Sequence, residues 1–249
     1  MMRTLLLALM LFPASQAFAQ ERVLYDSRLP YPEPRLTESE RSRVQYLARQ
    51  AAEQRAWSED DAGMDFCDGS DFRIEGAAPG AFTVKGRQQT AYVYTFCFRR
   101  PGNLQGLVVL DGLNVAAHYV FVNHISSMYA LKDINRNGFT ELVLDGGFTG
   151  QGYTEGWLDI VELGPVRRLL GQLNYEHLPQ PYHDNCGVVE SGGQWTSALI
   201  RVTPGPTPRY TWQQLTGRCG NERVATRTGP IKPLKLTPAP TGWAKGPMK

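Results

Sequence analysis

Short runs of β-branched and aromatic residues, separated by glycine, proline and asparagine, fill the middle of the chain. Seven runs recur at short intervals: TAYVYTFCF (90–98), GLVVLDG (106–112), HYVFVNH (118–124), ELVLDGG (141–147), WLDIVEL (157–163), SALIRVT (197–203) and RYTWQQL (209–215). Runs of this length bounded by turn residues predict β-strands. We therefore expect a mainly β domain over residues 65–228, a propeller-like or sandwich-like array of antiparallel blades.

A helical pattern precedes these strands. Thr37, with Glu40 three residues later, forms a capping box that begins a helix. Apolar residues then follow at helical spacing: Val44, Leu47, Ala48 and Ala51. We expect one helix over residues 37–57, preceded by an extended, proline-containing arm over residues 20–36.

The two ends of the chain differ in composition from its strand-rich middle. Residues 1–19 have a basic residue, a short apolar stretch and Ala17-Phe18-Ala19, the features of a cleaved signal peptide. No other segment is apolar enough to cross a membrane. Residues 229–249 are proline-rich and basic, which predicts a disordered tail. The sequence thus predicts a periplasmic or secreted protein.

Charge argues against a nucleic-acid partner. The net charge of +2 includes Arg3 and four lysines of the tail, and without them 21 basic residues face 24 acidic ones, a body near −3. A nucleic-acid-binding protein would carry a basic face. A protein, carbohydrate or other ligand is the expected partner, and the sequence does not identify it.

Four cysteines are compatible with two disulfides in an exported protein. Three pairings are possible. We favour Cys67–Cys97 and Cys186–Cys219, because each closes a loop of about thirty residues and contributes roughly 3 kcal/mol in the chain-entropy model. No CxxC spacing supports a zinc or redox site.

An internal similarity appears when residues 81–93 are placed above residues 133–145 without a gap. Phe82 then falls on Ile134, Gly86 on Gly138 and Gln89 on Glu141, at an offset of 52 residues. A fainter third copy is GQWTSALI (193–200). A unit near fifty residues suits four strands with their turns, as in one propeller blade.

The segment DINRNGFTE (133–141) carries the clearest candidate chemistry. Ca²⁺ takes six to eight oxygen ligands, and alternate positions supply the candidate ligands: Asp133, Asn135, Asn137, the carbonyl of Phe139, and Glu141. An EF-hand is excluded, because its position twelve is Leu144 and strands flank the loop. The alternative is that Asn137-Gly138 marks an ordinary hairpin turn without metal.

This segment resembles the calcium loop of FG-GAP or VCBS-type repeats, D-x-[DN]-x-[DN]-G-x-x-[DE] followed by an apolar strand. The resemblance implies a β-propeller blade with a structural Ca²⁺ and a non-enzymatic, ligand-binding role in an exported protein. The copy at 81–93 departs from the pattern, since it has Ala81, Thr83, Lys85 and Gln89 at the ligand positions, so only the loop at 133–141 could hold calcium.

Two further segments are candidate sites. In the glycine-rich run LDGGFTGQGYTEGW (144–157), Tyr153 and Trp157 either bind a sugar or peptide by stacking or belong to the core. In NYEHLPQPYHDNCG (174–187), His177 or His183 could pair with a nearby carboxylate for general base catalysis, which makes a small secreted hydrolase the alternative function.

Overall fold

The computed structural model describes residues 20–30, 32–54, 56–57, 67–98, 102–164, 168–173, 179–188 and 192–236. This part of the chain is mainly β with one helix, as predicted. In chain order the elements are β1 (Arg22–Tyr25), α1 (Glu38–Glu53), β2 (Arg73–Gly80), β3 (Gln89–Cys97), β4 (Asn103–Asp111), β5 (Asn114–Asn123), β6 (Ile125–Leu131), β7 (Glu141–Gly150), β8 (Tyr153–Glu162), β9 (Arg168–Leu173), β10 (Tyr182–Asp184), β11 (Gln194–Thr203), β12 (Arg209–Arg218) and β13 (Ala225–Leu234).

The strands form two antiparallel sheets. The smaller sheet has the order β2-β3-β4-β5, and the larger one runs β13-β12-β11-β10-β8-β7-β6, with β9 paired to β8 and β1 to β11. Consecutive strands β2 to β5 and β6 to β9 are therefore two four-stranded meanders. Strands β10 to β13 form a third meander, in which β10 is short.

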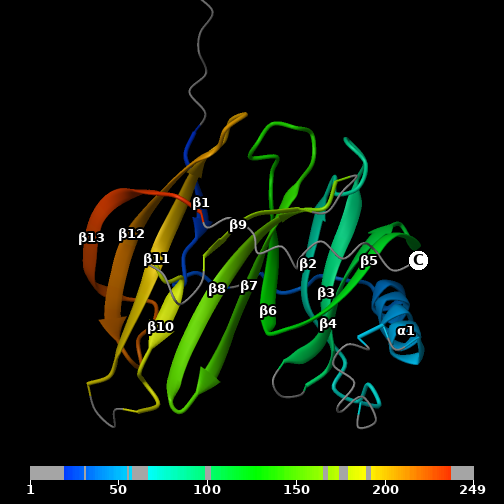
Figure 1. The fold of residues 1–249 in the computed structure, drawn as a ribbon, viewed down its shortest axis with the longest axis horizontal. Coiled ribbons are helices and arrows are strands. Elements are labelled where there is room, and N and C mark those ends of the chain that lie inside the picture. Colours follow the sequence, from blue (N-terminus) through cyan, green and yellow to red (C-terminus); the bar gives the residue numbers. More distant parts are fainter. Residues whose placement is uncertain are drawn as a thin grey trace, which may run out of the picture.

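These meanders stack as layers, with α1 outermost (Figure 1). One apolar cluster joins β2–β5 to β6–β8 through residues such as Val93 and Leu144. A second joins β7 and β8 to β1 and β11, with Val143 and Ile200 among its members. Because β3 and the first half of β7 are covered on both faces, consecutive residues there are buried, rather than alternate ones.

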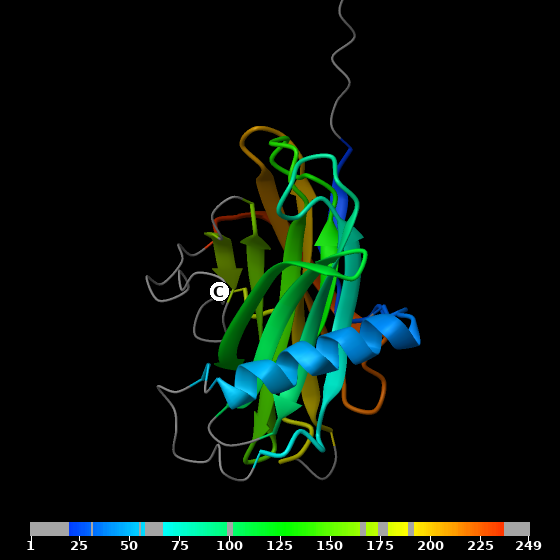
Figure 2. The same cartoon turned by 90° about the vertical axis from the view of Figure 1, so that its right-hand side faces the viewer.

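The helix covers the outer face of the smaller sheet. The capping box is confirmed, since Thr37 Oγ1 accepts the Glu40 N–H and the Glu40 carboxylate accepts the Thr37 N–H. Figure 2 shows α1 lying across the strands. Its buried stripe, which includes Val44 and Leu47, packs against aromatic residues of β3 such as Tyr92. Tyr92 also donates its hydroxyl to Glu40 at 2.6 Å, so the capping residue is tied to the sheet.

Both favoured disulfides are present. Cys67–Cys97 ties the segment before β2 to the end of β3, and Cys186–Cys219 ties the segment after β10 to the end of β12. Each closes about thirty residues and stabilises the fold by roughly 3 kcal/mol in the chain-entropy model. The two disulfides indicate an oxidising compartment.

The structure differs from the sequence prediction at both ends. β1 lies inside the predicted arm, where it pairs with β11. β13 ends at Leu234, so the tail predicted from residue 229 begins too early. Proline and lysine in β13 suggested disorder, but both are tolerated in a strand at the end of a sheet. The predicted signal peptide (1–19) and the rest of the tail (237–249) lie outside the described residues.

The faint third copy at 193–200 falls on β11. This is the second strand of the meander β10 to β13, as β3 and β7 are the second strands of theirs. The match in sequence is short, and the third copy stays a prediction.

Candidate functional site

The connection between β6 and β7 is folded by its own polar side chains. The Asp133 carboxylate accepts the backbone N–H groups of Asn137 at 2.8 Å and Gly138 at 3.0 Å. Asn135 Oδ1 accepts from Asn137 N, and Asn137 Oδ1 accepts from Phe139 N. Asp133 and Gly138 have positive φ values of 36° and 90°, conformations that Asp and Gly tolerate best. Short Asp and Asn side chains at alternate positions thus stabilise this turn locally.

Glu141 closes the loop from its C-terminal side. Its carboxylate accepts the N–H of Ile134 at 2.9 Å and of Asn135 at 3.3 Å, and the residue is fully buried. Burial, with a smaller contribution from the nearby Asp133 carboxylate, raises the pKa of Glu141 to about 7. Glu141 therefore acts as a side-chain cap whose charge is poorly compensated.

Gln89 caps the corresponding loop 52 residues earlier in the chain. Its Oε1 accepts the N–H of Phe82 at 3.1 Å and of Thr83 at 2.9 Å. Phe82 and Thr83 stand to Gln89 as Ile134 and Asn135 stand to Glu141 in the chain. A neutral amide thus closes one loop and a carboxyl group closes the other.

The carboxylate of Glu162 reaches the loop from β8, which the sequence did not predict. Glu162 is directly opposite Glu141 in the β7–β8 register. Its Oε2 accepts the side-chain amide of Asn135 at 2.8 Å and that of Asn137, while Oε1 accepts from Arg168. Burial would raise the pKa of Glu162, but these hydrogen bonds together hold the pKa below its usual value. An acidic residue at a buried position of WLDIVEL was the only sequence signal for this contact.

The donor set of the loop fits calcium in chemical type. Asp133, Asn135, Asn137, the Phe139 carbonyl and Glu141 would supply two carboxylates, two amides and one carbonyl, and each oxygen that accepts one N–H retains a second lone pair. A bound cation would offset the cost of burying the Glu141 charge beside Asp133. Within the described residues, no three side chains from His, Cys, Asp and Glu converge to hold a metal.

Tyr153 and Trp157, the predicted ligand-binding residues, lie on β8 four positions apart and differ in environment. Tyr153 is 42 % exposed and stacks on His183 with ring centroids 6.2 Å apart. Trp157 is half-buried and contacts the rings of Phe148 and His124. A Cβ on Gly146 would lie 2.6 Å from the Trp157 ring, so a glycine of this run makes room for the tryptophan. Tyr153 is the side chain that remains open to a ligand.

Neither His183 nor His118 is hydrogen-bonded to a carboxylate in the contacts found among the described residues. His183 Nδ1 lies 4.0 Å from the Glu155 carboxylate, beyond hydrogen-bond distance. His118 is buried, bonds to the Tyr94 hydroxyl at 2.8 Å, and has its pKa lowered to about 4 by burial. His177 lies outside the described residues.

Comparisons of the chain with protein-family models, with curated proteins and with solved structures find no match. In the described part of the chain, no helix has the length and apolar character needed to span a membrane.

Proposed function

We propose that the chain is an exported, non-enzymatic binding module built from repeated β units, with a structural calcium loop in its second unit. The observation that carries this proposal is the matching closure of two loops. Gln89 and Glu141, 52 residues apart, each accept two backbone N–H groups six and seven residues earlier. A shared side-chain cap at a fixed offset is expected of a structural repeat.

A propeller-like arrangement of the units is supported by the connections between their loops. The Thr140 N–H, in the loop before β7, donates to the Ala81 carbonyl in the loop before β3 at 2.8 Å. The Gly205 N–H, in the loop before β12, donates to the Ile134 carbonyl at 2.8 Å. The three loops thus lie in series at one end of successive meanders. The described units form an open array, since α1 covers the outer face of the first.

Calcium in this proposal is structural. The ion would bind in the loop 133–141. The loop is already held in shape by hydrogen bonds from its backbone N–H groups to the Asp133 and Glu141 carboxylates, so the ion would add stability to an existing conformation. With two formal charges in the ligand set, the affinity should resemble the roughly 10⁻⁴–10⁻³ M of extracellular modules. At 10 mM Ca²⁺ such affinities stabilise the folded state by about 1.4–2.7 kcal/mol.

Thermal unfolding with EDTA or 10 mM Ca²⁺ tests the loop. We expect the parent protein to gain several degrees in Tm with calcium, and Asp133→Ala to lose that gain. Arg136→Ala is the matched control, because Arg136 lies in the same loop but is not a proposed ligand. A parent protein whose Tm does not respond to calcium would rule out the metal site.

Ligand binding is assigned to the exposed face around Tyr153, for a protein or carbohydrate partner in the periplasm or outside the cell. A partly exposed tyrosine stacked on His183 presents an aromatic ring suited to such contacts. Screening a glycan array with the parent and with Tyr153→Ala tests this role, with Trp157→Ala as the comparison for lost packing. Binding unchanged in Tyr153→Ala would exclude the tyrosine.

The hydrolase alternative gains no support from the described residues. His183 is stacked on Tyr153 and stands 4.0 Å from Glu155, so it is not aligned as a general base. Hydrolysis of chromogenic esters, glycosides or peptides that disappears in both His177→Ala and His183→Ala would revive it.

A further inference from the structure

Strands β2 and β6 lie side by side, but their facing edges do not pair as a β-ladder. We call the space between these two edges the seam. In the described sheets, β2 pairs only with β3, and β6 only with β7. The strands approach closely at one end, where a Cβ on Gly76 would lie 2.7 Å from the Met128 nitrogen. At the other end, Thr140 N–H donates to the Ala81 carbonyl, and Ala81 N–H donates to Thr140 Oγ1 at 3.0 Å. Both ends of this seam are thus closed.

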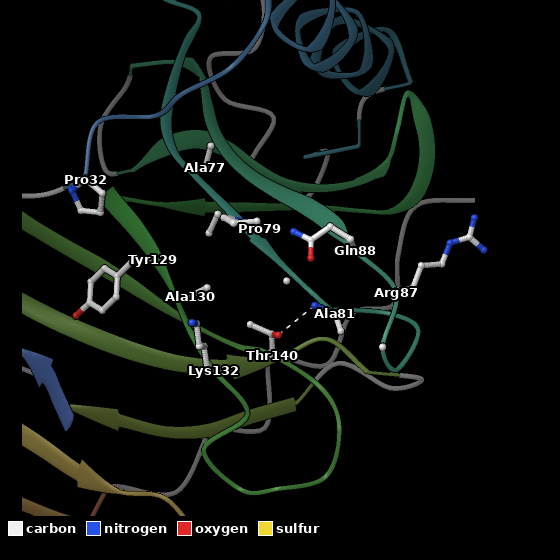
Figure 3. A pocket seen from close by; sticks show the side chains of 13 residues that line it. Pro32, Ala77, Pro79, Ala81, Arg87, Gln88, Tyr129, Ala130, Lys132 and Thr140 are labelled. Atoms are coloured by element: carbon white, nitrogen blue, oxygen red, sulfur yellow. Dashed lines mark hydrogen bonds between the residues drawn. The ribbon is translucent and has the colours of Figure 1, made fainter. Parts of the chain in front are cut away.

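A cavity of about 580 Å³ opens between these two ends. Figure 3 shows Ala77, Pro79 and Ala81 on its β2 side and Tyr129 and Ala130 on its β6 side. Pro32, from the arm before α1, borders it as well. The volume is within the roughly 300–1,000 Å³ typical of small-molecule pockets.

The cavity exists because the seam is lined by small side chains. Residues 77–81 read AAPGA, and Ala130 faces them from β6. The cavity is open to solvent on one side, so a ligand can enter it without a change in the fold. Pro79 has no N–H to donate from the β2 edge, which disfavours an added peptide strand and favours a small molecule.

The charged residues that line the cavity are both cationic. Arg87 forms an ion pair with Asp111, and Figure 3 shows its guanidinium directed away from the cavity. Lys132 is exposed, and none of the ion pairs found among the described residues uses its ammonium group. With no acidic residue in the lining, the electrostatics favour an anion at the Lys132 end.

We propose that the seam between β2 and β6 binds a small amphipathic organic anion. Its apolar body lies against Ala77, Pro79 and Ala130, and its carboxylate or sulfonate accepts a hydrogen bond from the Lys132 ammonium. This site goes beyond the proposed function, because it requires neither the calcium loop nor Tyr153.

Fluorescence titration with 8-anilinonaphthalene-1-sulfonate, an aromatic sulfonate, tests the site in EDTA-containing buffer. We expect saturable, one-to-one binding to the folded parent protein. Lys132→Gln should weaken binding about tenfold or more, as expected for loss of a charge-assisted hydrogen bond. Lys235→Gln is the matched control, an exposed lysine outside the cavity lining that should leave binding unchanged. Decanoate should displace the probe at much lower concentration than decanol.

Ala130→Leu provides a second test, because it fills the cavity without changing its charge. It should weaken the binding of both probe and decanoate, and circular dichroism establishes whether the variant remains folded. If Ala130→Leu does not fold, Lys132→Gln alone decides. Equal binding by the parent and Lys132→Gln, equal displacement by decanoate and decanol, or no saturable binding by folded parent protein would each overturn the proposal.

Discussion

Glu141→Gln separates the two roles of Glu141, capping a loop and carrying a buried charge. Ile134 and Asn135 donate to different oxygens of Glu141, whereas the single Oε1 of Gln89 accepts the N–H groups of both Phe82 and Thr83. One glutamine oxygen is therefore enough to close such a loop. The substitution should therefore keep the loop closed and remove only the titrating group. Without calcium, its effect on stability should depend on pH.

The sign and size of this pH dependence follow from the pKa of Glu141. Burial raises the pKa of Glu141 from 4.5 to about 7 in the folded protein, so the folded state binds the proton more tightly than the unfolded state. The favourable contribution of protonated Glu141 to the free energy of unfolding is complete below about pH 4.5 and is lost as the pH rises through 7. Above that pH the buried charge costs up to about 3 kcal/mol, from 1.36 kcal/mol per pKa unit.

Urea unfolding followed by circular dichroism in EDTA, from pH 4.5 to 8, measures this difference. Glu141→Gln should match the parent near pH 4.5 and exceed its free energy of unfolding by up to about 3 kcal/mol at pH 8. The reciprocal Gln89→Glu should lose stability as the pH rises, because it buries a new carboxyl group. A Glu141→Gln protein less stable than the parent throughout this range would refute the assignment of Glu141 as a cap that a neutral amide can replace.

Three further substitutions test other parts of the fold. Gly146→Ala should destabilise the protein by about 1–3 kcal/mol, because its Cβ would meet the Trp157 ring at 2.6 Å. Thermal unfolding measures this loss, with Gly205→Ala as the control, since a Cβ on Gly205 has no neighbour closer than 3.9 Å. Asp159→Asn should stabilise the protein above pH 7 by at most about 4 kcal/mol, because burial raises the pKa of Asp159 to about 7. The asparagine oxygen can still accept the hydrogen bond from Gln172. Urea unfolding at pH 5 and 8 checks the sign of the effect. Glu162→Ala should lower the free energy of unfolding by about 1–3 kcal/mol in EDTA, because the side-chain amides of Asn135 and Asn137 lose this acceptor. Protection of the loop N–H groups from hydrogen exchange should also fall. Unchanged exchange would contradict this role of Glu162.

Some strands were not among the sequence predictions, for a reason visible in their composition. β2 reads RIEGAAPG and β6 reads ISSMYAL, with few β-branched or aromatic residues. Such residues are enriched where a strand packs tightly on its neighbours, whereas β2 and β6 border the open seam. Weak strand propensity and the cavity thus have the same origin, small side chains at the seam.

The sequence by itself determined the features that depend on neighbouring residues. The capping box of α1 spans three residues, and the polar loop at 133–141 folds through contacts of Asp133, Asn135 and Asn137 with N–H groups up to five residues away. The preference for Cys67–Cys97 and Cys186–Cys219 also rested on short chain separations, where closing a loop costs least entropy.

Only the tertiary structure decided which distant groups meet. Glu162 reaches Asn135 and Asn137 because the β7–β8 register places it opposite Glu141, and a shift of one residue would turn it to the other face. Lys132 borders a cavity with Arg87 because β2 and β6 approach without pairing. Such contacts depend on how whole strands pack, and local spacing along the chain carries no record of them.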